Sequence, residues 1–127
     1  MTSEMTITFE GTYIQAVSNG EKNLEVASLL WSQIAKTCEK HQCFKVLGIA
    51  NSSSPVSTTE SVDHIELFQQ LGITRKYRIA WVELNHESAR TTYLIENLLS
   101  SHGLTCRMFM DIQEAKEWLF YGRSMKG

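Results

Sequence analysis

The sequence has 127 residues, with 12 Lys or Arg against 14 Asp or Glu, so its formal net charge is −2. This length fits one compact domain, and the near-neutral charge provides no field to attract nucleic acid or an anionic membrane. The odd number of cysteines, 3, argues against a disulfide framework. No apolar stretch is long enough to span a bilayer, and the first residues lack the basic start and apolar core of a signal peptide. We therefore expect a cytoplasmic protein with a single domain over residues 1–127.

The first half of the chain predicts two short strands, a helix and a third strand. Apolar and polar residues alternate over 5–9 and again over 13–17, which is typical of two antiparallel strands joined by a tight turn. Over 24–38 the apolar residues recur at helical spacing, and Asn23 precedes them as a candidate N-cap. Residues 44–50 are apolar and partly β-branched, so we expect them to form a buried strand.

A second helix and a fourth strand follow. Ser57 and Glu60 have the spacing of a capping box, in which each side chain satisfies the backbone N–H of the other residue. Gly72 is expected to end this helix, because the residue after a helix often needs a positive φ. Residues 77–83 contain a contiguous apolar run and are expected to form a central strand.

The third helix is expected between Asn85, a candidate N-cap, and Gly103, a candidate stop. Its predicted apolar stripe consists of Tyr93, Leu94, Leu98, Leu99 and His102.

The last two predicted elements are a strand over 105–109 and a helix that begins after it. Asp111 and Glu114 repeat the capping-box spacing. The apolar face expected for this helix consists of Ile112, Ala115, Trp118 and Leu119.

The predicted order is therefore β-β-α-β-α-β-α-β-α. Strands separated by single helices favour parallel pairing with right-handed crossovers, so the expected fold is α/β, with a mixed, mostly parallel five-stranded sheet and four helices. In such sheets ligands bind beyond the carboxyl ends of the strands. Three loops meet this condition, at 51–54, 83–86 and 110–111.

Three segments together resemble bacterial SpoIIAA-like proteins: the apolar strand that leads into Asn51-Ser52-Ser53-Ser54, the strand over 77–82, and the ending over 109–119. This group joins the STAS domain (sulfate transporter and anti-sigma factor antagonist) to lipid-binding CRAL-TRIO folds. The resemblance covers residues 5–119. It implies a non-catalytic regulatory module that binds a protein partner, such as a kinase or an anti-sigma-like factor, or a small apolar ligand between helix and sheet.

STAS antagonists carry Asp, Ser or Thr, Ser and Gly after a central strand, and a partner kinase phosphorylates the Ser. By position, Asn51 stands for the Asp, Ser52 for the Ser or Thr, Ser53 for the phosphorylated Ser, and Ser54 for the Gly. Asn51 lacks the charge of the Asp, and Ser54 followed by Pro55 lacks the flexibility of the Gly. The resemblance makes Ser53, and then Ser52, the candidate phosphorylation sites, whereas the plain reading is that these serines cap and solvate a loop.

A second candidate site, from a different class, is catalytic. Glu83, Asn85 and His86 lie together after one strand, and His86 beside a carboxylate could act with Asp111 as acid and base. The competing structural reading is that such residues collect at helix starts as caps. For a binding protein the same two loops, with Asn51 and Ser54, are the candidate ligand or partner loops.

We expect most of the remaining reactive residues to have structural roles. The spacing of the cysteines matches no metal motif, so no metal or cofactor is expected and the thiols should lie in the core. Arg75, Lys76 and Arg78 are expected to form a solvated turn at the amino end of their strand. Phe120 and Tyr121 are a candidate dimer contact or a lid over a pocket. A ligand carrier would need an apolar cavity of roughly a few hundred Å³.

Overall fold

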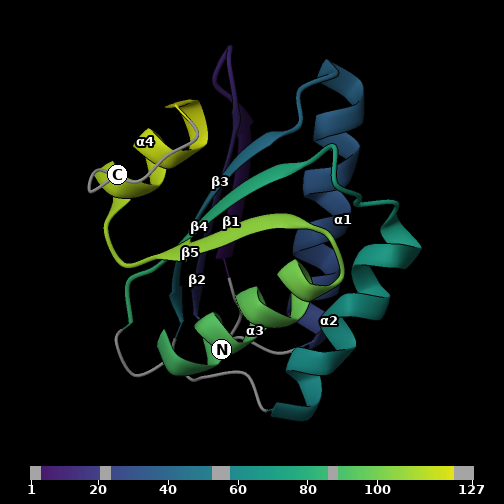
Figure 1. Ribbon diagram of the computed structural model, residues 1–127. Helices are drawn as coiled ribbons and strands as arrows, with labels where there is room; N and C mark the ends of the chain where they lie inside the picture. The colour runs from purple at the N-terminus through teal and green to yellow at the C-terminus, as the bar shows by residue number, and fades with distance from the viewer. Residues whose placement is uncertain (1–3, 21–23, 53–57, 86–88, 122–127) are drawn as a thin grey trace.

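The computed structural model describes residues 4–20, 24–52, 58–85 and 89–121. Five strands and four helices follow one another in the predicted order (Figure 1). They are β1 (Glu4–Phe9), β2 (Ile14–Gly20), α1 (Leu24–His41), β3 (Lys45–Ser52), α2 (Thr58–Leu71), β4 (Arg78–Glu83), α3 (Ala89–Ser101), β5 (Thr105–Phe109) and α4 (Ile112–Tyr121).

The strands form one sheet in the order β1-β2-β3-β4-β5. β1 and β2 pair antiparallel, and every other neighbouring pair is parallel. The prediction of a mixed, mostly parallel sheet with four helices is therefore confirmed. None of the helices in the described ranges is long and apolar enough to cross a membrane.

The helices cover the two faces of the sheet unequally. α1, α2 and α3 lie on one face, and α4 lies alone on the other (Figure 1). Because successive side chains of a strand point to opposite faces, each strand contributes to two separate cores. In β4, Ile79 and Trp81 belong to the core under α1, α2 and α3, whereas Ala80 and Val82 belong to the core under α4. We call these the three-helix face and the α4 face.

The predicted helix ends are partly confirmed. Gly72 and Gly103 follow α2 and α3 with φ of 74° and 85°, as a C-terminal stop requires. The carboxylate of Asp111 accepts a hydrogen bond from the N–H of Glu114 at 3.1 Å, which caps α4. The predicted caps Asn23 and Ser57 lie outside the described residues.

The predicted apolar stripe of α3 is confirmed for Leu99 and is wrong for Tyr93, Leu94 and His102. Ile95 and Leu99, one helical turn apart, are buried, whereas Tyr93 and Leu94 are 41% and 36% exposed. His102 is also exposed, and its Nδ1 lies 2.9 Å from the carbonyl oxygen of Leu98. The run of apolar residues at 93–95 fits two helical phases, and contact with the sheet selects the one that contains Ile95.

The expected solvated turn around Arg78 is also wrong for Arg78 itself. Its guanidinium donates hydrogen bonds to the carbonyl oxygens of Trp118 at 2.8 Å and Leu119 at 3.2 Å, near the C-terminus of α4. The same group lies 3.9 Å from the centroid of the Trp118 ring, and burial lowers the pKa of Arg78. Lys76, by contrast, is half exposed and pairs with Glu39 at 3.4 Å. Arg78 therefore attaches α4 to the sheet.

Candidate functional site

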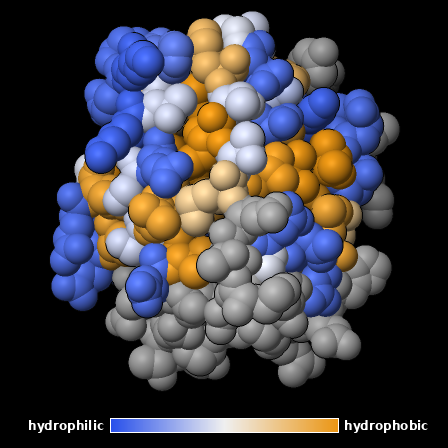
Figure 2. Space-filling model, turned by 180° about the vertical axis from the view of Figure 1, so that it is seen from behind, coloured by the Kyte–Doolittle hydropathy of each residue, from blue (hydrophilic) through white to orange (hydrophobic). Residues whose placement is uncertain are grey.

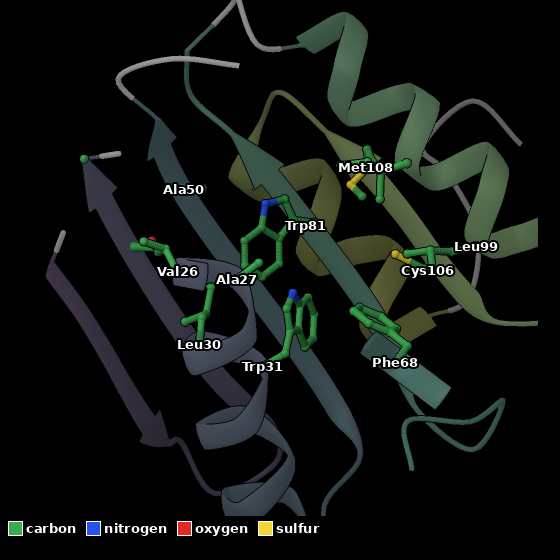
Figure 3. A pocket seen from close by; sticks show the side chains of 13 residues that line it. Val26, Ala27, Leu30, Trp31, Ala50, Phe68, Trp81, Leu99, Cys106 and Met108 are labelled. Atoms are coloured by element: carbon green, nitrogen blue, oxygen red, sulfur yellow. The ribbon is translucent and has the colours of Figure 1, made fainter. Parts of the chain in front are cut away.

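The three-helix face contains an apolar cleft. It lies between α1, α2, α3 and the sheet, and Figure 3 shows the tryptophans at its centre. The volume of the cleft is about 40 Å³, and the empty space in and around it, open solvent included, is about 600 Å³. The lining residues are Ser18, Gly20, Val26, Ala27, Leu30, Trp31, Ala50, Phe68, Trp81, Ile95, Leu99, Cys106 and Met108.

Trp81 forms the floor of the cleft because of the residue beside it on β3. Trp81 pairs with Gly48 in the β3–β4 register. A Cβ atom at position 48 would collide with three carbon atoms of the Trp81 ring, Cε3, Cζ3 and Cδ2. Glycine at this position therefore lets the indole lie flat over the neighbouring strand.

Aromatic contacts fix the centre of the cleft. The ring centroids of Trp31 on α1 and Trp81 on β4 are 5.2 Å apart, and those of Trp31 and Phe68 on α2 are 4.6 Å apart. Both contacts are tilted, which is a favourable geometry for aromatic pairs. Ala27 and Ala50 line the cleft near these large rings and leave part of the space unfilled.

The wall formed by α3 is held to β5 by two side chains. The Glu96 carboxylate accepts a hydrogen bond from the N–H of Met108 at 2.5 Å, and the Ser100 hydroxyl donates to the carbonyl oxygen of Cys106 at 3.4 Å. Cys106 and Met108 both line the cleft. These bonds therefore hold the wall in place and occupy backbone groups of β5.

The thiols near the three-helix core are protonated at neutral pH. Burial and, to a smaller extent, the Glu96 charge raise the pKa of Cys106 to about 12. Burial, then the neighbouring Cys43 and Glu39, raise the pKa of Cys38 to about 12. Thiolates are the nucleophilic form of cysteine, so these two side chains are unsuited to nucleophilic chemistry. Within the described ranges no three His, Cys, Asp or Glu side chains are grouped to hold a metal ion.

The serine segment predicted as a switch is only partly described. Asn51 is an exposed residue of β3, and Ser52 is the last residue of that strand. Ser53 and Ser54 lie outside the described residues. The segment follows the carboxyl end of β3, as predicted, and its phosphorylation stays a prediction.

The second predicted site is built around a buried carboxylate. Glu83 is 1% exposed, and its Oε2 accepts a hydrogen bond from the N–H of Asn85 at 3.1 Å. Asp111 is exposed and caps α4, and His86 lies outside the described residues. The two hydrogen bonds named here lie in the turns that follow β4 and β5. A joint catalytic role of Glu83, His86 and Asp111 stays a prediction.

The resemblance implied an apolar ligand between helix and sheet, but Trp31 and Trp81 were not identified as residues of the cleft. A signal was present in the small residues Gly48 and Ala50 of β3, since small residues beside large aromatic ones leave space. Two residues beyond Trp81 on β4, Glu83 faces the same side of the sheet. The structure thus brings one predicted site residue, Glu83, to the side that carries the cleft.

Comparisons with known proteins agree with the fold. No family model matches the sequence, and no curated protein shows a significant match. Among solved structures, the chain is similar to an uncharacterized protein of the DUF3478 family with a SpoIIAA-like fold from Shewanella loihica PV-4. The TM-score is 0.52 with 14% sequence identity, over 92% of this chain and 93% of that chain. At this identity the likeness concerns the fold alone, and it confirms the predicted SpoIIAA-like fold.

Proposed function

We propose that this SpoIIAA-like chain is a non-catalytic binding module that takes a small apolar ligand into the cleft of the three-helix face. The observation that carries the proposal is the cleft itself, an open hollow between helices and sheet with a mostly apolar lining. Concave sites lined mainly by apolar and aromatic side chains, with a few polar groups, are typical of small-ligand binding.

The size of the cleft limits the ligand. A volume of about 40 Å³ holds a few water molecules or one small apolar group, with the remainder of a ligand in the open mouth. This is less than the cavity expected for a carrier that encloses a whole lipid. The proposal is therefore for a small ligand, or the small apolar end of a larger one.

Fluorobenzene, followed by fluorine NMR, tests the proposal with a probe of suitable size. We expect saturable binding to the full chain and its loss in Ala27→Leu, because Ala27 lines the cleft and a leucine would fill the space. Ser28→Leu is the matched control, since Ser28 is the next residue of α1 and is absent from the lining. No binding, or equal binding to both variants, would contradict the proposal.

A protein partner is the second candidate, because large apolar residues also reach the surface. Leu29 on α1 is 55% exposed and Phe9 on β1 is 40% exposed. Figure 2 shows apolar residues across the middle of the rear face. Exposed apolar patches often mark protein contacts.

A kinase or an anti-sigma-like factor would be such a partner, and the predicted phosphorylation of Ser53 or Ser52 would regulate its binding. Incubation with cell extract and ATP, followed by mass-spectrometric mapping of phosphate, tests this phosphorylation. An unmodified segment 51–54 would contradict it.

A further inference from the structure

Two buried hydrogen-bond donors border the cleft without an acceptor. Trp31 and Trp81 are 6% and 5% exposed, and neither indole Nε1–H has an acceptor among the described residues. Among the described residues, Tyr77 Oη is the only side-chain polar atom that is both fully enclosed and without a hydrogen-bond partner. Neither indole nitrogen is therefore fully enclosed. The two indole nitrogens therefore keep access to the open space of the cleft. An indole nitrogen is a donor only, so an acceptor has to come from a bound molecule.

The two indole rings lie close together, and their nitrogens face a common direction. Their rings are 5.2 Å apart between centroids. Figure 3 shows the nitrogen of each indole on the side of its ring that is turned toward the carboxyl ends of the strands. Each indole N–H points outward in the plane of its ring, so an acceptor oxygen has to lie beyond the ring edge, where it would replace water in the open space of the cleft.

The charges on the described residues around the cleft disfavour an anionic ligand. No Lys, Arg or His is among the described lining residues, and the buried Glu83 faces the same side of the sheet two residues beyond Trp81. A carboxylate or phosphate would lose its hydration here without meeting a positive charge, which is strongly unfavourable. Among the described lining residues, the polar side-chain groups are the Ser18 hydroxyl, the Cys106 thiol and the two indole N–H groups.

We infer that the cleft binds a small uncharged molecule with a carbonyl-type oxygen on an apolar body, and that the indole N–H of Trp31 or of Trp81 donates to this oxygen. The inference rests on the proposed function and adds the chemical class of the ligand. Part of the apolar body occupies the hollow beside Ala27 and Ala50, the remainder lies in the open mouth, and the oxygen lies toward the carboxyl ends of the strands.

Acetophenone and α-methylstyrene test this inference, because they have nearly the same shape and differ by a C=O in place of a C=CH₂ group. The chain has three tryptophans, and their indole N–H resonances are resolved by proton–nitrogen NMR and assigned with single Trp→Phe variants. We expect acetophenone to shift at least one of the Trp31 and Trp81 indole protons downfield and to leave Trp118, on the α4 face, unchanged. α-Methylstyrene should give no downfield shift.

Affinities measured for single variants give an independent readout. Trp31→Phe and Trp81→Phe keep an aromatic ring but remove the donor, so the variant that lacks a shifted indole N–H should weaken acetophenone binding about fivefold, the equivalent of one net hydrogen bond. Binding of α-methylstyrene should change much less, and Trp118→Phe should affect neither compound. If a variant fails to fold, the indole shifts of the unaltered protein decide the question.

Different results would overturn the carbonyl specificity and the binding of apolar ligands. Binding of both compounds without indole shifts, or with equal weakening of both in the Trp→Phe variants, would overturn the carbonyl inference and leave the binding module intact. If neither compound nor fluorobenzene binds, the proposed function fails and the inference fails with it.

Discussion

The two faces of the sheet use tryptophan in different ways. On the α4 face, Trp118 packs against Phe109 at 5.9 Å between ring centroids, and the Arg78 guanidinium covers its ring. On the three-helix face, Trp31 and Trp81 border an open cleft. The difference shows where this small domain gains stability and where it gives up packing: α4 is held closely to the sheet, whereas the three helices leave room between them.

Loss of the Arg78 contacts should have the largest effect on stability. Arg78→Met keeps the length of the side chain but removes both hydrogen bonds to α4 and the contact of the charge with Trp118. Because hydrogen bonds to charged groups contribute roughly 1.5–3 kcal/mol, we expect the free energy of unfolding to fall by about 3 kcal/mol in urea denaturation.

Arg107→Met is the matched control for this variant. Arg107 is an exposed arginine on the neighbouring strand β5, and its replacement should change the free energy of unfolding by less than about 0.5 kcal/mol. Equal effects of the two variants would mean that α4 does not depend on Arg78. Fluorobenzene binding should survive in folded Arg78→Met, since the cleft lies on the other face.

Gly48→Ala should have the next largest effect, and it acts on the three-helix face. The added methyl group would collide with the Trp81 ring, so the indole must move from its position over β3. Overpacking of this kind usually costs roughly 1–3 kcal/mol, and we expect a loss of about 2 kcal/mol together with a shift of the Trp81 indole resonance.

A double-mutant cycle isolates the cause of the Gly48 effect. In a Trp81→Leu background the ring is absent, so Gly48→Ala should cost much less than in the unaltered chain. An equal cost in both backgrounds would show that position 48 needs glycine for reasons of backbone conformation. The explanation by contact with the Trp81 ring would then be wrong.

The contrast between the two faces also explains what could be predicted from the sequence. Alternation and helical spacing are local signals, so all nine elements were predicted in order, and Ala115, Trp118 and Leu119 are buried on α4 as expected. The stripe of α3 was partly misassigned because its apolar run fits two helical phases, and only contact with the sheet distinguishes them.

The site depends on contacts between residues distant in the chain. The position of Trp81 over Gly48 follows from the register of β3 and β4. Arg78 donates to the carbonyl oxygen of Trp118, which lies 40 residues further along the chain. A cleft is missing volume, which arises where residues of several elements fail to fill a space. Ala27 and Ala50 are indistinguishable from ordinary core alanines by local pattern.

The same substitution on the two faces compares them directly. Ala115 on α4 is 0% exposed in a filled core, so Ala115→Leu should lower the free energy of unfolding by about 1.5 kcal/mol through overpacking. Ala27→Leu projects into the cleft and should leave stability within about 0.5 kcal/mol or raise it, as cavity-filling substitutions often do. Thermal and urea denaturation measure both, and equal losses would mean that the cleft closes in solution.

The smallest expected effect concerns alkaline pH. Burial raises the pKa of Cys106 from 9.0 to about 12, so between these values the unfolded chain loses a proton that the folded chain keeps. Stability is therefore fully present below pH 9 and falls as the pH rises toward 12. Cys38 and Tyr77, whose pKa values are also raised to about 12 mainly by burial, add to the same loss. All three groups belong to the three-helix core.

Cys106→Ala separates the contribution of one of these groups. Its free energy of unfolding should fall less between about pH 8 and pH 10 than that of the unaltered chain, by about 1 kcal/mol, because one group no longer titrates. The value of each protein at the lower pH serves as its own reference, so the cavity left by the smaller side chain cancels. Equal pH dependence in both proteins would show that water reaches the Cys106 thiol through the cleft and that this side of the three-helix face is wetter than the α4 face.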